Sequence, residues 1–124
     1  MITDVFCKII NKELPADIIM EAVDWLAIND IHPQAPVHIL ILPKKHIGDV
    51  SDAKPAEAEL IGRLVLAANQ VARKIGLEKG FRLIINQGEH GGQLVPHLHI
   101  HLLGGRRLGP KIVHDQNAKF KDQK

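Results

Sequence analysis

Residues 96–103 of the chain, PHLHIHLL, place histidine at every second position with an apolar residue in each gap. This spacing is the period of a β-strand, so the three histidines face one side and the apolar side chains face the other. The stretch therefore predicts a strand with one buried face and one row of imidazoles. At a rise of roughly 3.3 Å per residue, His97 and His101 lie about 13 Å apart. One small substrate centred on His99 is then within reach of all three.

Two other interpretations of this row stay open. A histidine in a strand is usually a buried residue with satisfied hydrogen bonds and no chemical role. Histidines two positions apart on a strand can also chelate zinc, which needs a third ligand from His46, His90 or the remaining strand histidine. Three imidazoles in register favour a catalytic site, and we expect neither a metal nor a cofactor in it.

The composition indicates one ordinary globular domain. The chain has 124 residues, of which 45% are hydrophobic and 3% aromatic, with no Tyr. Few aromatic side chains argue against base stacking, so we expect no nucleic-acid partner. Residues 105–124 hold six Lys and Arg against two Asp, whereas residues 1–104 hold ten against twelve Asp and Glu. We therefore divide the chain into a domain at residues 1–109 and a basic C-terminal arm at residues 110–124.

Cysteine usage and the first residues bear on the location of the protein. Cys7 is the single cysteine of the sequence, so no intramolecular disulfide can form. No signal peptide or long apolar run opens the sequence. We expect a soluble cytoplasmic protein without membrane contact, in which Cys7 is a small buried helix residue.

The hydrophobic pattern predicts two helices and about five strands. Thr3 or Asp4 can cap a short helix that Pro15 ends. A second helix begins near Pro55 and runs to Gly76, with apolar residues at spacings of three and four. Strands are expected at residues 17–21, 25–28, 37–42, 81–86 and 96–103. The fold class is α+β, a mostly antiparallel sheet of about five strands with one long and one short helix.

Several motifs resemble those of a known family. HLHIHLL at residues 97–103 looks like the signature of the histidine triad family, in which histidines alternate with apolar residues. Flanking segments are similar to its Hint branch of nucleotide-binding phosphoramidases; they are LPKKHI at 42–47, NQG at 86–88, GGQ at 91–93 and GGR at 104–106. The resemblance covers residues 4–107. It implies the same α+β fold and a two-fold homodimer that joins two sheets.

The residue types suffice for chemistry at phosphorus. A neutral imidazole is a competent nucleophile, and an unperturbed pKa of about 6.5 keeps much of it neutral at neutral pH. The glycine-rich segment 88–93 precedes a predicted strand, so it is neither a Walker loop nor a dinucleotide fingerprint. Backbone N–H groups around Gly92 and Leu94 can instead form an anion nest beside His99.

The resemblance assigns roles to these residues. It implies that His99 is the nucleophile and is transiently nucleotidylated, with His97, His101 and His46 at the same site. It also implies that Asp30 accepts hydrogen bonds from the ribose hydroxyls. The residues that it implies for the purine pocket are Ile31, Ile28, Asn29, Phe6, Ile9 and Leu14, and those for the phosphate are Asn86, Gly92, Gln93 and Leu94.

The implied activity is hydrolysis of the P–N bond of purine nucleoside phosphoramidates through a covalent nucleotidyl-histidine intermediate. One alternative is a dinucleoside polyphosphate hydrolase, which the GGR segment at 104–106 argues against. Another is a nucleotide-binding regulatory module with incidental turnover. Two departures from the branch bear on specificity: Leu94 stands where Ser or Thr is frequent, and Ile28 and Asn29 replace the Phe-His of the animal members.

Overall fold

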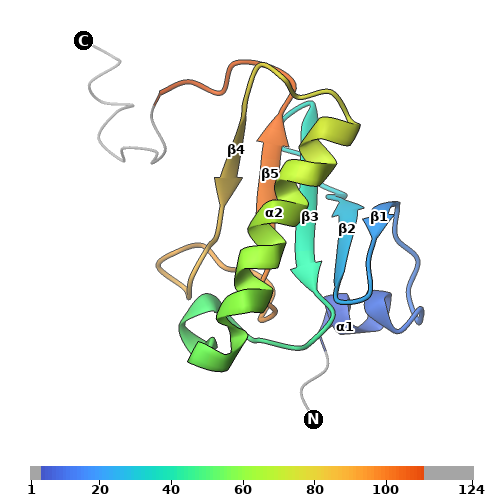
Figure 1. Cartoon of the computed structure of the whole chain (residues 1–124), viewed down its shortest axis with the longest axis vertical. Coiled ribbons are helices and arrows are strands. Elements are labelled where there is room, and N and C mark those ends of the chain that lie inside the picture. The colour runs from blue at the N-terminus through green and yellow to red at the C-terminus, as the bar shows by residue number, and fades with distance from the viewer. Residues whose placement is uncertain (1–3, 111–124) are drawn as a thin grey trace.

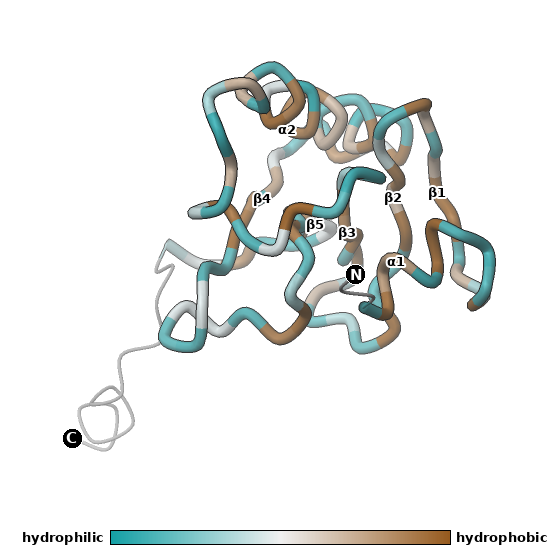
Figure 2. The backbone as a smooth tube through the Cα atoms, turned by 90° about the horizontal axis from the view of Figure 1, so that it is seen from below, coloured by the Kyte–Doolittle hydropathy of each residue, from teal (hydrophilic) through white to brown (hydrophobic). Residues whose placement is uncertain are grey.

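The computed structural model describes residues 4–110, in which two helices pack on opposite faces of a five-stranded sheet (Figures 1 and 2). The elements are α1 (Val5–Ile10), β1 (Ile18–Glu21), β2 (Trp25–Asn29), β3 (Val37–Pro43), the 3-10 turns η1 (Val50–Asp52) and η2 (Pro55–Glu57), α2 (Ala58–Lys74), β4 (Phe81–Ile84) and β5 (Ile100–Gly104). The strand order is β1-β2-β3-β5-β4, and each neighbouring pair is antiparallel. The predicted α+β class is confirmed.

Each face of the sheet carries its own apolar core. On one face, Leu64 and Val71 of α2 are fully buried against Ile41 of β3. On the other face, Phe6 of α1 packs against a cluster that includes Ile28 of β2. The division follows from the strand period, because successive side chains of a strand point to opposite faces. Figure 2 shows α2 on one side of the sheet and α1 on the other.

The histidine stretch forms a shorter strand than the predicted 96–103. β3 pairs with β5 only as far as Ile100, and β4 pairs with it only as far as His101. Among residues 4–110, the backbone of residues 97–99 has no strand neighbour. It is held instead by a 2.6 Å hydrogen bond from the N–H of Leu98 to the carbonyl of Ile47. The alternation still holds, because Leu98 is buried in the core beneath α2.

Two other predicted boundaries were wrong by a few residues. The long helix begins at Ala58, because Pro55 starts the 3-10 turn η2 rather than the helix itself. β4 ends at Ile84 and not at residue 86, because the Asn86 side chain turns the chain by donating to the carbonyl of Gly91 at 2.7 Å. Neither change moves an element from one face of the sheet to the other.

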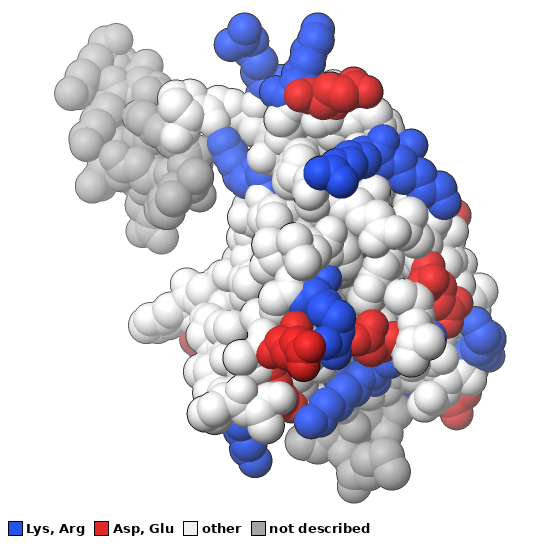
Figure 3. All heavy atoms as spheres, in the orientation of Figure 1, with Lys and Arg blue, Asp and Glu red and all other residues white. Residues whose placement is uncertain are grey.

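Charged side chains of both signs are mixed on the face that carries α2 (Figure 3). Arg63 of α2 donates to Asp24 in the β1–β2 turn at 2.6 Å, and Lys45 pairs with Glu57 at 2.8 Å. Such surface pairs contribute at most about 1 kcal/mol each. Among residues 4–110, neither helix has the length and apolar run that a membrane crossing requires.

Gly105, directly after β5, is a position where the fold requires glycine. Its φ is +91°, and a Cβ there would lie 2.9 Å from the Cβ of Pro36. We expect Gly105→Ala to lower the free energy of unfolding by about 1–3 kcal/mol in urea denaturation, because both conformation and space oppose a side chain.

Gly62→Ala is the matched control for this substitution. Gly62 lies in α2, and an added Cβ meets nothing within 4 Å among residues 4–110 beyond its own helix and neighbours. We expect a gain of about 0.5–1 kcal/mol, since alanine favours the helix. Equal stability of Gly105→Ala and the wild type would contradict the prediction.

Candidate active site

The three histidines of the row lie together on the α1 face of the sheet, where β5 begins. The ring centroid of His99 is 4.9 Å from that of His101 and 5.1 Å from that of Phe6 in α1. His97 is fully buried, with its ring centroid 5.9 Å from that of Phe6. The structure thus brings the predicted row together, with His99 at its centre.

His99 is held in one tautomer. Its Nδ1 lies 2.6 Å from the backbone carbonyl oxygen of His97, and a carbonyl only accepts, so Nδ1 carries the proton. Nε2 then keeps its lone pair, which nucleophilic attack requires. Burial lowers the pKa of His99 below 6.5; the carbonyl of His97 opposes this shift, and the charge of the His97 ring adds to it. His99 is therefore neutral at neutral pH.

A buried histidine outside the row, His38 of β3, orients His101. The N–H of Gln34 donates to Nδ1 of His38 at 3.0 Å, so the proton of a neutral His38 lies on Nε2. That Nε2 is 2.9 Å from Nδ1 of His101, which leaves the N–H of His101 on its own Nε2. Burial and the charges of His99 and His38 lower the pKa of His101 to about 4, and only Asp30 opposes them.

The sequence prediction placed His46 at the site and missed His38. The structure places His46 beside His97, with ring centroids 5.1 Å apart, and places His38 on His101. A signal for His38 was present, because the period of the strand at residues 37–42 puts it on the face opposite Ile39. The nearly continuous apolar run concealed it. A catalytic role of His46 stays a prediction.

Asp30, the residue predicted for the ribose, lies at the same end of the row. Its Oδ2 is 3.4 Å from Nε2 of His38, and its Oδ1 accepts from the N–H of His32 at 2.8 Å. The side chain is partly exposed. The carboxylate therefore lies beside the row with access to solvent.

The residues predicted for the purine divide into two groups. Phe6 and Ile28 are buried in the cluster on the α1 face, and Ile9 packs against that cluster. Leu14 is exposed, as is Ile31, whose exposed fraction is 87%. The amide of Asn29 is engaged with the carboxylate of Asp17 at 2.7 Å. Phe6, Ile28 and Ile9 thus form an apolar wall beside the histidines.

The predicted phosphate loop is organised by its own amide side chains. Gln93 accepts from the N–H of Gly88 at 3.0 Å and donates to the carbonyl of Gly48 at 2.8 Å. Asn86 donates to Gly91 within the loop. These two amides therefore hold the loop in place, and any contact with an anion falls to the loop backbone.

The two other residues predicted for the phosphate lie at the exposed surface of this loop. Gly92 has a φ of +80°, which favours glycine. The side chain of Leu94 is 93% exposed. Leu94 therefore does not pack in the protein core. Nothing in its packing explains why leucine stands where Ser or Thr is frequent.

A second polar cluster lies at the start of α1, beside the row. Asp4 caps the helix by accepting the N–H of Cys7 at 2.8 Å. Its Oδ2 is 3.1 Å from Nδ1 of His46 and 3.1 Å from Nδ1 of His97. Burial acts to raise the pKa of Asp4, but the Cys7 hydrogen bonds and the charge of His97 outweigh it, and the pKa is lowered. Asp4 is therefore a carboxylate.

Cys7 also belongs to this cluster, where only a small buried helix residue was expected. The thiol is half-buried in α1, with Sγ 3.4 Å from Nδ1 of His46. Burial raises the pKa of Cys7, and so does the carboxylate of Asp4. Asp4, Cys7, His46 and His97 offer four potential metal ligands within 4.8 Å of one another, a grouping that no local sequence pattern announces.

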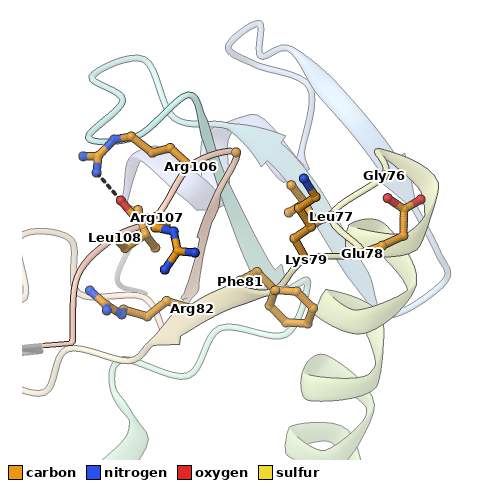
Figure 4. A pocket seen from close by; sticks show the side chains of 11 residues that line it. Gly76, Leu77, Glu78, Lys79, Phe81, Arg82, Arg106, Arg107 and Leu108 are labelled. Atoms are coloured by element: carbon orange, nitrogen blue, oxygen red, sulfur yellow. Dashed lines mark hydrogen bonds between the residues drawn. The ribbon is translucent and has the colours of Figure 1, made fainter.

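An open recess of about 760 Å³ lies at the opposite end of β5 (Figure 4). Its lining includes Phe81, Arg82, Arg106 and Arg107, and none of the histidines of the described residues. The histidine row and the groups that contact it lie elsewhere, so this recess is not the candidate active site.

Comparison with known proteins agrees with this geometry. The family model described as the HIT domain matches residues 11–108. The chain is 46% identical over 111 residues to a protein of Escherichia coli (strain K12) named purine nucleoside phosphoramidase. The match covers 89% of this chain and 93% of that protein. It is 50% identical over 104 residues to an uncharacterized HIT-like protein of Synechococcus elongatus, covering 84% of this chain and 91% of that protein.

Solved structures share the fold. A HIT family hydrolase from Clostridium thermocellum superposes with a TM-score of 0.88 at 50% identity, over 91% of this chain and 99% of that chain. A HIT family hydrolase from Legionella pneumophila superposes with a TM-score of 0.84 at 44% identity, over 86% and 96%. Sequence, fold and histidine geometry thus agree, and the chain belongs to the HIT family as one of its enzymes.

Proposed function

We propose that this enzyme hydrolyses the P–N bond of purine nucleoside phosphoramidates through a covalent nucleotidyl-His99 intermediate. The observation that carries the proposal is the hydrogen bond from Nδ1 of His99 to the carbonyl of His97, which leaves Nε2 as a nucleophile. The relative from Escherichia coli, at 46% identity, carries the name of this activity. The residue types agree with it, since a neutral imidazole is able to attack phosphorus without a metal.

The reaction has two displacement steps. Nε2 of His99 attacks phosphorus, and the P–N bond to the leaving amine breaks as the bond to His99 forms. The amine takes its proton from water, because both ring nitrogens of His97 face acceptors, Asp4 at 3.1 Å and the Pro43 carbonyl at 2.9 Å. Water then attacks the same phosphorus, releases the nucleoside monophosphate and returns its proton to solvent. Neutral His99 is regenerated, and no metal or cofactor takes part.

His101 stabilises the phosphoryl oxygens in this scheme. With Nδ1 occupied by His38, its Nε2–H is the group free to donate to developing negative charge. Its low pKa keeps the ring neutral, so it acts as a hydrogen-bond donor rather than as a cation. His38 acts through His101 and is a positioning residue.

The nucleoside lies along the α1 face in this proposal. The carboxylate of Asp30 accepts from the ribose hydroxyls, and Phe6 and Ile28 provide the apolar wall for the base. Backbone N–H groups near Gly92 hold the phosphate. None of these contacts involves the leaving group.

A two-fold homodimer along β4 is part of the proposal. β4 is an edge strand, and three apolar side chains on or beside it, Phe81, Leu83 and Ile85, are each more than a third exposed. An uncovered apolar edge invites pairing with another strand. The Hint resemblance implies two sheets joined into one. The cytoplasmic location stays a prediction, and residues 111–124 of the basic arm lie outside the described part of the chain.

Removal of the nucleophile tests the reaction directly. We expect His99→Ala to lower the rate of amine release from adenosine 5′-phosphoramidate by at least about a thousandfold, because no other group forms the covalent intermediate. Binding of adenosine monophosphate, measured by calorimetry, should stay within about tenfold of wild type. His90→Ala, which removes an exposed histidine outside the row, is the control. Retention of most activity by His99→Ala would refute the mechanism.

The pH dependence follows from the burial of His99. Only the neutral ring attacks, and its pKa is lowered, so the active form persists as the pH falls below 6.5. We expect the acid limb of kcat/KM, measured from about pH 4 to about pH 8, to have its midpoint below 6.5. His90→Ala should give the same profile. A midpoint at or above 6.5 would show that His99 is not the buried nucleophile proposed here.

A further inference from the structure

A recess lined by positive side chains lies where β4 begins and β5 ends, away from the histidine row (Figure 4). One wall is residues 76–82, which are the α2–β4 loop and the first residues of β4, and the other is residues 105–108 after β5. Its volume of about 760 Å³ is that of a small-molecule site. We propose that this recess binds a small anion with a chain of two or more phosphates.

Positive charge is concentrated in the recess. The charged residues of its lining are Lys79, Arg82, Arg106, Arg107 and Glu78. Four positive side chains and one negative side chain give the recess a net charge of +3. The whole sequence has a net charge of +2, so the rest of the chain sums to −1. A concave surface lined by one sign of charge attracts ions of the opposite sign, and this balance therefore indicates an anion.

Neighbouring carboxylates do not neutralise these positive side chains. Within residues 4–110, every ion pair of a lysine or arginine with a carboxylate lies outside the recess. Figure 4 shows the carboxylate of Glu78 on the far side of the recess from the three arginines. The part of the chain that the structure describes thus leaves the guanidinium groups available to an anion from solution.

Backbone carbonyls hold two of the guanidinium groups. Arg82 donates to the carbonyl of Gly109, and Arg106 donates to the carbonyl of Arg107 at 2.7 Å. Because a guanidinium has five N–H donors, each group keeps donors for a ligand, and its planar fork matches two oxygens of a phosphate. A single phosphate group carries only about two negative charges at neutral pH, which is less than the charge of the recess. A phosphate chain therefore balances the recess better than one phosphate does.

The two walls of the recess contact each other through Leu77 and Gly104. A Cβ on Gly104 would lie 3.0 Å from Cδ1 of Leu77, so the leucine side chain lies directly on the backbone at the end of β5. The loop is also held by its own hydrogen bonds, from the N–H of Leu77 to Ala72 at 3.0 Å and from the N–H of Gly80 to Leu77 at 3.2 Å. The recess therefore exists before a ligand binds, which lowers the entropic cost of binding.

Apolar side chains lie beside the positive ones. Leu77, Phe81 and Leu108 line the same recess, and Phe81 is more than a third exposed. Such a surface suits an organic group attached to the phosphate chain. Two sources thus offer the same recognition chemistry, an inorganic polyphosphate and a nucleotide with several phosphates.

The recess is separate from the proposed hydrolysis and compatible with the proposed dimer. None of the histidines among residues 4–110 lines it. Phe81 and Arg82 belong to β4, the proposed dimer edge. Antiparallel pairing of two β4 strands places their first residues at opposite ends of the shared edge, so the two recesses of a dimer would not face each other.

Calorimetry on the full-length protein with sodium tripolyphosphate tests the charge and the arginines. We expect tripolyphosphate to bind at least about tenfold more tightly than orthophosphate, because its charge is higher. Arg106→Gln and Arg107→Gln should each weaken tripolyphosphate binding by about tenfold or more, since each removes a charge and a donor fork. Arg73→Gln removes the same charge from an exposed position of α2 outside the recess and is the control. Equal affinities of Arg106→Gln and Arg73→Gln would overturn the proposal.

NMR spectra of the backbone amides locate the binding site without any variant. Titration with tripolyphosphate should shift the signals of residues 76–82 and 105–108 in a saturable way. Absence of such shifts in these two segments overturns the proposal, whether or not the glycine-rich loop at residues 88–93 responds.

A parallel titration with adenosine triphosphate distinguishes the two sources of a phosphate chain. If the amides of the recess saturate at lower concentrations of adenosine triphosphate than of tripolyphosphate, and Phe81→Ala removes this difference, the ligand is a nucleotide. If they saturate at equal or higher concentrations, the ligand is the inorganic chain. Both results support a polyphosphate site, and saturation by neither compound refutes it.

Discussion

The 2.6 Å hydrogen bond from Nδ1 of His99 to the carbonyl of His97 is the constraint on which the site depends. It exists because β5 begins at Ile100. Had the strand pairing continued to residue 97, neighbouring strands would compete for this carbonyl through the ladder. The early end of pairing therefore leaves one backbone acceptor for a side chain, while the anchoring of Leu98 on Ile47 keeps the unpaired segment in place. The loss of strand pairing before Ile100 therefore also fixes the tautomer of His99.

The sequence predicted the layout of the sheet well because strand period and core burial point the same way. Histidine alternating with apolar residues places Leu98 under α2 and His99 on the opposite face, and the structure confirms it. Strand ends were harder to predict, because they depend on where neighbouring strands stop. His38 was missed inside an apolar run. Cys7 contacts His46, which is 39 positions away in the sequence, and His97, which is 90 positions away. No local sequence pattern predicts such contacts.

Burial keeps the imidazoles of His99 and His101 neutral at the expense of acid stability. The pKa of His101 is about 4 in the folded chain, against about 6.5 when unfolded, and that of His99 is lowered too. Below pH 6.5 the unfolded chain therefore binds more protons than the folded one, and stability declines as the pH falls toward about 4. The same desolvation that keeps His99 neutral thus narrows the pH range in which the fold persists.

Helix α1 has a consequence for how such sites diversify. Its six residues, Val5–Ile10, precede the segment 11–108 that matches the family domain, yet Phe6 lies against both His97 and His99. Its capping residue Asp4 reaches the ring of His97 as well. The sheet carries the histidine row, and the short N-terminal helix supplies part of its surroundings. Substitutions among these few leading residues therefore alter what surrounds the histidines, while the strands that carry the row keep their own sequence.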